Sequence, residues 1–421
     1  MGMELYPGCY REVLSNGLVV LAEVRDRRPL SLGLWVRVGS RDEPEERAGS
    51  AHFLEHMLFK GTTRRSAYRI AEEIDSLGGA SNGATHEEYT VYYISVLSEH
   101  LEEALDILAD LVQNPLLREE DIEREKGVIL EEIRMIEDHP QEKIFDLFIE
   151  RSWKDHHPLT RSVLGRAETV QGLSREKLLE QFALYTPKNM VLVGVGGIEF
   201  PKLLELAQAK LGDAHGGAAA PERCPPEFQR HFHIEDHSSK QAHLCLGVAG
   251  PARASEKRFA YEILNALLGS GMSSQLFRRI REELGLAYAV FSMPHYYLDS
   301  GLFIIYIGTE PRNAPRAVEV ALEEIARFRR EPVSEERLRL AKEKLKGNLL
   351  LGLESSQARM VRLGLGELYD LHMPIEDVIA RIEGVTAEEV QEVAELLFSE
   401  PLSLTAIGPE RRLKGLEQLL S

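Results

Sequence analysis

The sequence predicts an α+β protein made of two tandem α/β halves, and three observations support this prediction. The chain has 421 residues, more than one hydrophobic core usually serves. A segment rich in Gly, Ala and Pro, residues 212–226, lacks apolar periodicity and is typical of a connection between domains. The order of strand and helix signals is similar on both sides of it. We predict an N-terminal half over 1–214, a linker over 215–227 and a C-terminal half over 228–421.

The elements follow one another in the same order in both halves. In the first half, a strand-like segment over 31–40 precedes a helix over about 49–59. In the second half, residues 241–250 have the strand pattern and the helix is expected around 259–268. In both halves a Leu-Gly pair, further strands, a proline turn and a long helix come next. Such self-similarity is typical of a duplicated unit.

The duplication allows polar side chains to be compared within the chain. The alignment pairs a set of His and Glu residues in the first half with a set in the second half that contains neither type. The first set is His52, Glu55, His56 and Glu132, and the second is Tyr261, Leu264, Asn265 and Leu349. We therefore expect only the first half to carry a metal site.

Three polar residues share one face of the helix over 49–59. A period of 3.6 residues puts His52, Glu55 and His56 on one side of a helix that is otherwise apolar. Buried imidazoles and a carboxylate need a partner, because unpaired buried polar groups are costly. Zn²⁺ accepts His nitrogen and carboxylate oxygen, so the spacing predicts zinc bound by His52 and His56, with Glu55 as general base. The alternative is a pair of hydrogen-bonded core histidines.

The third ligand is predicted from the faces of the helix over 122–136. Two acids, Glu125 and Glu132, interrupt its apolar stripe. Glu131 lies on the opposite, solvated side, where an acid needs no partner. We predict Glu132 as the third zinc ligand and Glu125 as a catalytic support that orients a His ligand or holds charge near the metal. The alternative for Glu125 is a buried ion pair.

Composition and charge exclude other classes of protein. The formal net charge of −18 opposes a phosphate-binding surface, so we expect no nucleic-acid partner. No apolar run approaches the roughly 20 residues of a membrane-spanning helix, and the first residues show no export signal. Three cysteines far apart in sequence do not form a disulfide framework. We expect a soluble protein of the reducing cytoplasm with no membrane partner.

The motifs around the candidate ligands resemble those of a known family. Residues 51–62 read Ala-His-Phe-Leu-Glu-His-Met-Leu-Phe-Lys-Gly-Thr, and residues 128–133 read Val-Ile-Leu-Glu-Glu-Ile. Glu132 follows His56 by 76 residues. The chain resembles, over nearly its whole length, the pitrilysin and mitochondrial processing peptidase family of inverted zincins, especially its bacterial members. The resemblance implies two halves, each a mostly antiparallel sheet covered by helices, that face each other like a clamshell around the substrate.

The resemblance also implies an activity and further site residues. It implies a zinc metalloendopeptidase with one Zn²⁺ per chain that cleaves short or unfolded peptides. Asn82 matches the family's strand-binding Asn, and Gly83 stands where Ala is expected. Arg281 and Tyr288 match an Arg and a Tyr of the second half that reach the substrate in relatives. A homodimer, or pairing with a related subunit, is the implied assembly.

These predictions define one mechanism and two rival functions. In the expected mechanism, zinc polarises the scissile carbonyl and lowers the pKa of its bound water towards about 7. Glu55 takes the proton of that water and later gives it to the leaving amine. Tyr288 helps to stabilise the oxyanion. The rivals are a non-catalytic scaffold subunit and a protein that captures peptides without cleaving them, and metal content and peptide cleavage separate the three.

Overall fold

The structure is a computed structural model that describes residues 2–26, 28–214 and 218–420. The contacts between its residues divide the chain into two compact units. Unit 1 comprises Met1–Arg134, Arg161–Cys224 and Gly352–His372, and unit 2 comprises Met135–Thr160, Pro225–Leu351 and Met373–Ser421. Each unit therefore includes a segment from the other side of the predicted linker. Of that linker, residues 215–217 lie outside the described residues, and 218–227 contain no helix or strand.

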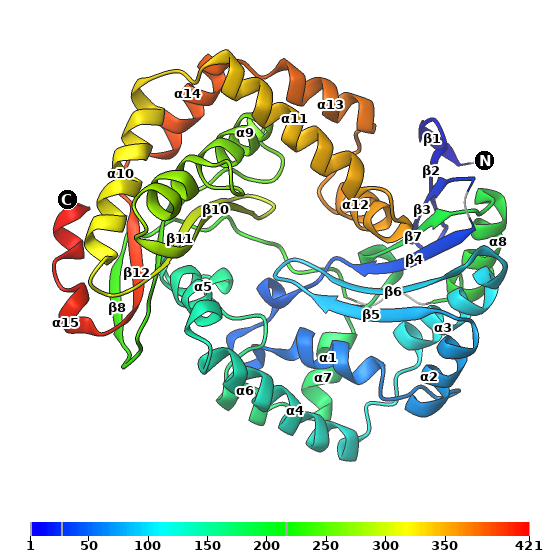
Figure 1. Ribbon diagram of the computed structural model, residues 1–421. Helices are drawn as coiled ribbons and strands as arrows, with labels where there is room; N and C mark the ends of the chain where they lie inside the picture. Colours follow the sequence, from blue (N-terminus) through cyan, green and yellow to red (C-terminus); the bar gives the residue numbers. More distant parts are fainter. Residues whose placement is uncertain (1, 27, 215–217, 421) are drawn as a thin grey trace. The chain divides into compact units, whose positions relative to one another are not determined.

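Unit 1 contains a seven-stranded sheet (Figure 1). Its strands are β1 (Met3–Tyr6), β2 (Cys9–Val13), β3 (Val19–Val24), β4 (Pro29–Val36), β5 (Ala80–Thr85), β6 (Thr90–Leu97) and β7 (Met190–Gly196). They lie in the order β1-β2-β3-β7-β4-β6-β5, with β3 and β7 parallel and the other neighbours antiparallel. Along β4, Leu32 and Leu34 join one hydrophobic core and Trp35 joins another. Side chains alternate between the two faces of a strand, so this sheet is buried on both faces.

Unit 2 contains a five-stranded sheet with the same topology. Its strands are β8 (Phe232–Asp236), β9 (Ala242–Ala249), β10 (Ala287–Tyr296), β11 (Gly301–Thr309) and β12 (Ser403–Gly408). The order β8-β12-β9-β11-β10, with β8 and β12 parallel, repeats the order β3-β7-β4-β6-β5 of unit 1. The predicted fold class is confirmed in this respect: the chain is an α+β protein with two related α/β parts, and each sheet is mostly antiparallel.

Helices cover one face of each sheet. Those of unit 1 are α1 (Ser50–Leu58), α2 (Ala67–Ser76), α3 (Leu101–Gln113), most of α4 (Glu119–Glu137), α6 (Ala167–Gln171), α7 (Arg175–Phe182) and α8 (Phe200–Leu211). Those of unit 2 are α9 (Arg258–Leu268), α10 (Ala314–Arg330), α11 (Glu335–Gly352), α13 (Ile375–Gly384), α14 (Ala387–Leu397) and α15 (Glu410–Leu413). Their apolar faces form the main core of each unit with the sheet. Across the described residues, no helix has the length and apolar character needed to cross a bilayer.

One further helix covers the second face of each sheet. In both cases this helix comes from the other side of the predicted linker. The two helices are α5 (Pro140–Arg151) and α12 (Ser356–Leu368). Helix α12 packs on β4 and β7 of unit 1 (Figure 1). There Met360 joins Trp35 in one hydrophobic cluster. Helix α5 packs on β9 and β12 of unit 2, where Phe148 joins Tyr306. The predicted division in chain order does not describe these two helices, because an amphipathic helix can pack on any matching apolar face.

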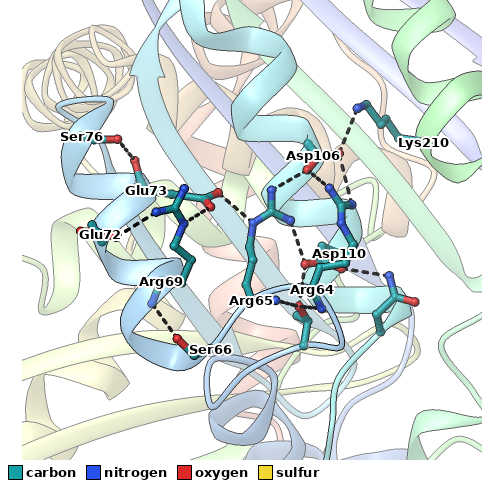
Figure 2. A network of polar contacts seen from close by, with 12 residues as sticks. Arg64, Arg65, Ser66, Arg69, Glu72, Glu73, Ser76, Asp106, Asp110 and Lys210 are labelled. Carbon is teal, nitrogen blue, oxygen red and sulfur yellow. Dashed lines mark hydrogen bonds and ion pairs between the residues drawn. The ribbon is translucent and has the colours of Figure 1, made fainter.

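A network of ion pairs fixes the chain where it leaves α1 (Figure 2). Arg65 lies 2.6 Å from Asp106 and 2.8 Å from Asp110, both on α3, and 2.8 Å from Glu73 on α2. Lys210 of α8 lies 2.9 Å from Asp106. Burial works to raise the pKa of Asp106, but the hydrogen bonds from these cations outweigh it and hold the pKa well below its usual range. The segment after α1 is therefore anchored to α2 and α3, and Lys210 ties α8 to the same carboxylate of α3.

Candidate metal centre

The N-cap residue of helix α1 has no side chain that could accept a hydrogen bond from the first turn, and the carboxylate of Glu43 accepts these bonds instead. The N-cap residue, Gly49, has a φ of 93°, a conformation that favours glycine. The carboxylate of Glu43 accepts hydrogen bonds from the N–H groups of Gly49 at 2.8 Å and Ala51 at 2.5 Å. A helix leaves such groups unpaired at its start. Burial raises the pKa of Glu43 to about 8, although these donors work against it. The first turn of α1 is thus fixed one residue before His52.

Two imidazoles of α1 meet a carboxylate of α4. The apolar side chains of α1, such as Phe53 and Met57, are buried in the core of unit 1, whereas His52 and His56 are partly exposed. The Nε2 atoms of His52 and His56 each lie 3.8 Å from Oε2 of Glu132. Within the described residues, this is the only group of three His, Cys, Asp or Glu residues whose ligand atoms converge, all within 4.8 Å of one another. The structure brings the three predicted ligands together.

These donors fit a zinc ion. Zinc takes His nitrogen at about 2.0–2.1 Å and carboxylate oxygen at about 2.0–2.2 Å in tetrahedral geometry, which puts neighbouring donors roughly 3.3–3.5 Å apart. The 3.8 Å separations between Nε2 and Oε2 are slightly wider than this. Burial, together with the nearby His56, lowers the pKa of His52 to about 4, so the ring is neutral and can donate a lone pair at neutral pH. Three protein donors leave a fourth position open, as in catalytic zinc sites.

Glu125 of α4 supports this group from behind. Its Oε1 lies 2.9 Å from Nδ1 of His56, and its Oε2 lies 2.7 Å from Nζ of Lys60. Burial works to raise the pKa of Glu125, but the two contacts outweigh it and lower the pKa. For His56, burial works to lower the pKa, but the bond to Glu125 and the carboxylates of Glu132 and Glu55 raise it. The sequence predicted that Glu125 either supports a His ligand or forms a buried ion pair. The structure shows both contacts, because Oε1 lies against His56 and Oε2 pairs with Lys60.

Glu55 lies on the same helix and reaches strand β5. Its Oε2 accepts a hydrogen bond of 2.5 Å from the hydroxyl of Thr85. The side chain also lies against Gly83, where an added Cβ would come within 2.8 Å of Cγ and 2.9 Å of Oε1 of Glu55. Gly83, which stands where Ala was expected, therefore leaves the space that Glu55 occupies. Burial raises the pKa of Glu55, although the hydrogen bond from Thr85 works against it.

Sequence reasoning missed two of these residues, Thr85 and Lys60. Thr85 lies two residues after Gly83 on β5, so both lie on the same face of the strand, and this alternation was a usable signal. Lys60 follows His56 by four residues, the spacing of neighbours on a helix surface. Its partner Glu125 lies on another helix, and the sequence does not indicate that contact.

Comparisons with known proteins identify the family. Residues 18–166 match the sequence model described as Insulinase (Peptidase family M16), and residues 172–345 match the one described as Peptidase M16 inactive domain. An uncharacterized zinc protease of Mycobacterium tuberculosis is 38% identical over 419 residues, covering 97% of this chain and 95% of the relative. Another uncharacterized zinc protease, from Bacillus subtilis, is 36% identical over 403 residues, covering 95% and 98%. The chain belongs to peptidase family M16.

Solved structures share the fold of this M16 chain. A protease from Helicobacter pylori superposes with a TM-score of 0.91 at 22% sequence identity, covering 95% of this chain and 99% of that structure. A structure of a peptidase M16 inactive domain from Pseudomonas fluorescens gives a TM-score of 0.88 at 21% identity, covering 95% and 98%. At these identities the likeness concerns the fold.

In this M16 chain, the substrate-binding residues predicted in the first half lie on an edge strand. Strand β5 pairs with β6, and its other edge has no strand partner in the described part of the chain. Asn82 is exposed on β5, and its Oδ1 accepts a hydrogen bond of 3.0 Å from the N–H of Gly83. An open edge of this kind can pair with an extended peptide.

The two predicted substrate contacts of the second half lie in unit 2. Arg281 is on a π-helical turn, Phe277–Glu283, with its guanidinium 4.8 Å from the centre of the Phe277 ring. Tyr288 is on the edge strand β10, 39% exposed, and its hydroxyl lies 3.4 Å from that of Tyr306. The roles of Arg281 and Tyr288 towards the substrate remain predictions.

In the second half of this M16 chain, the helix equivalent to α1 has no His or Glu at the positions that match His52, Glu55 and His56. Helix α9 follows β9 as α1 follows β4, and its residues Tyr261, Leu264 and Asn265 are buried. The Oδ1 of Asn265 accepts a hydrogen bond of 2.7 Å from the hydroxyl of Ser292. These residues serve packing and local hydrogen bonding in unit 2.

Proposed function

We propose that this M16 chain is a zinc metallopeptidase whose catalytic centre lies in unit 1. The observation that supports this most directly is the convergence of donors from His52, His56 and Glu132 on the helix that also carries Glu55. The relatives in Mycobacterium tuberculosis and Bacillus subtilis carry the name zinc protease. A scaffold protein has no need of two acids, Glu125 and Glu132, on one otherwise apolar stripe of α4.

In this mechanism His52, His56 and Glu132 hold one zinc ion per chain. When bound, zinc supplies a Lewis acid that polarises the scissile carbonyl and makes a water easier to deprotonate. Glu55 takes the proton of the attacking water and delivers it to the leaving amine. Burial raises the pKa of Glu55, which helps the carboxyl group to keep the proton until it is transferred. Thr85 fixes the orientation of Glu55 through its hydrogen bond to Oε2.

The open edge of β5 supports an extended peptide as the substrate. A peptide that adds to this edge as a strand passes Asn82 and Gly83, and Glu55 lies against Gly83. Strand addition needs unpaired backbone N–H and C=O groups on the peptide. Short or unfolded peptides offer such groups, whereas the backbone of a folded protein is already paired. We therefore propose an endopeptidase for short or unfolded peptides.

The test compares zinc content and peptide cleavage in matched variants. Glu55→Gln is expected to bind about one zinc per chain and to lose cleavage of a fluorogenic peptide library. His52→Ala, His56→Ala and Glu132→Ala are expected to lose both zinc and cleavage. Glu131→Gln serves as a control, because Glu131 is the exposed neighbour of Glu132 on α4. Chelation should abolish wild-type cleavage, and added zinc should restore it.

Other outcomes would favour the rival functions. Full turnover by zinc-loaded Glu55→Gln would contradict the role of Glu55. A wild-type protein that takes up no zinc and cleaves nothing would indicate a scaffold. A wild-type protein that binds zinc and library peptides without cleaving them would indicate a peptide-capturing protein.

A further inference from the structure

Lys60 and His56 contact the two oxygens of one buried carboxylate. The side chain of Glu125 is 5% exposed, with His56 Nδ1 2.9 Å from Oε1 and Lys60 Nζ 2.7 Å from Oε2. Among the described residues, Lys60 is the only Lys or Arg within ion-pair distance of Glu125. A buried carboxylate is costly unless a cation and hydrogen bonds compensate its charge. The imidazole of His56 provides a hydrogen bond, and Lys60 provides a positive charge.

The pairing also determines how α4 lies against α1. Lys60 follows His56 by four residues, just beyond the end of α1. Glu125 of α4 is therefore bound at two points to the same end of α1. Glu132 follows Glu125 by seven residues, which is about two helical turns, so the two carboxylates lie on one stripe of α4. Holding Glu125 in place therefore holds Glu132 opposite His52 and His56.

We propose that Lys60 is a positioning residue of the metal centre, and this inference rests on the proposed function. Lys60 binds Oε2 of Glu125 and holds the carboxylate in place against Nδ1 of His56. When Nδ1–H donates to Glu125, Nε2 of His56 carries the lone pair that faces Glu132. Without Lys60, the buried carboxylate lacks its cation, and the His56 ring and the register of α4 lose their anchor.

The direction of the effect separates this role from a simple charge effect. A lysine that acted only as a nearby positive charge would repel a zinc cation, and its removal would tighten zinc binding. A lysine that positions Glu125 has the opposite effect, because its removal loosens a ligand. Removing a partner that supports a metal ligand typically costs about 10- to 100-fold in metal affinity. Lys60 acts one contact further out, so we expect a loss of about 3- to 10-fold.

The experiment measures zinc affinity of the full chain, with metal removed beforehand, by competition with a chromophoric chelator. Lys60→Met is expected to raise the zinc Kd about 3- to 10-fold, and Lys60→Arg, which keeps the cation, to restore most of the affinity. Lys126→Met is the matched control, because Lys126 pairs at 2.7 Å with Glu123, an exposed residue of the same helix α4. In a Glu125→Gln background, Lys60→Met is expected to have no further effect. Circular dichroism of each metal-free variant checks the fold.

The results distinguish failure of this inference from failure of the proposed function. If the wild-type chain binds no zinc, the proposed function itself is wrong. If the wild type binds zinc and Lys60→Met binds it equally or more tightly, only the role of Lys60 is overturned. An equal loss of affinity in the wild-type and Glu125→Gln backgrounds would also overturn it, because Lys60 would then act without Glu125.

Discussion

The hydroxyl of Thr85 donates a hydrogen bond of 2.5 Å to Oε2 of Glu55, and this bond joins strand β5 to helix α1. Thr85 is the last residue of β5, the strand with the open edge, and Glu55 lies between the two histidines of α1 in sequence. The carboxylate proposed as catalytic base is therefore oriented by the same strand that is proposed to pair with the peptide. Strand β5 would therefore hold both the bound peptide, at its open edge, and the catalytic base, through Thr85.

Thr85→Val is expected to reduce kcat and to leave zinc content unchanged. The substitution removes a hydrogen bond to a charged group, a type of bond that contributes about 1.5–3 kcal/mol. If that contribution is felt in the transition state, kcat falls at least roughly 10-fold. Steady-state peptide cleavage and metal analysis measure the two quantities. Thr85→Ser keeps the hydroxyl and should retain most of the activity, and a Thr85→Val enzyme with wild-type kcat would show that the bond does not orient the base.

Gly83→Ala is expected to lower cleavage although it restores the residue type expected from the family. The new Cβ would lie 2.8 Å from Cγ of Glu55, so the carboxylate must shift. Small displacements of a catalytic group can cost up to roughly 100-fold in rate, and we expect a loss of about 10-fold. Kinetics with a fluorogenic peptide test this, with zinc content as the check on the ligands. Gly127→Ala on α4 is the control, because its Cβ would meet nothing within 4 Å; equal kinetics for the two variants would refute the prediction.

Gly364→Ala is expected to destabilise the packing of α12 on unit 1. Its Cβ would lie 2.3 Å from the ring of Trp35, a side chain that is 1% exposed and has little room to move. Forcing extra volume into a packed core costs about 1–3 kcal/mol. Urea unfolding followed by tryptophan fluorescence measures the change. Gly347→Ala, within helix α11 and with open space around its Cβ, should be neutral or slightly stabilising, and a neutral Gly364→Ala would mean that α12 does not pack closely on β4.

Acidification is expected to weaken the contacts of Glu367 at the end of α12. Burial works to raise its pKa, but hydrogen bonds from His372 and Arg11 outweigh it and lower the pKa to about 2. A carboxylate with a lowered folded-state pKa stabilises the fold above its unfolded pKa, which lies near 4.5. That stability is lost as the pH falls from about 4.5 to about 2. Denaturant unfolding of the wild type and Glu367→Gln at several pH values should show a difference that shrinks in this window, and a constant difference would contradict it.

Helical periodicity was enough to predict which residues meet at the metal centre. His52 and His56 lie one turn apart on one helix, and Glu132 interrupts an apolar stripe on another, so local pattern and charge indicated all three. The second contact of Glu125 could not be predicted in this way. It depends on Lys60, which only the packing of α4 against the end of α1 brings within reach.

The order of strands and helices along the chain was also predictable in part, because the two halves repeat the same signals. The sequence did not predict which sheet α5 and α12 pack on, because an apolar helix face can pack on either sheet. The predicted assembly, cellular location and roles of Arg281 and Tyr288 remain predictions. The assembly and the two substrate contacts depend on surfaces of other molecules, which local sequence patterns do not determine.

Helix α5 packs on the sheet of unit 2 and helix α12 on the sheet of unit 1. This arrangement affects the order in which the chain can fold during synthesis. The hydroxyl of Ser356 on α12 donates to the carbonyl of Pro29 on β4, a contact that spans 327 positions. When the strands of the first sheet have been synthesised, α12, which covers the second face of that sheet, has not yet been made. In contrast, α5 is made before the sheet that it covers. The nascent first half therefore exposes an apolar face around Trp35 until α12 has been made, and a chaperone could shield that face in the meantime. A chain cut near residue 224 should yield two fragments that fold well only when they are made together.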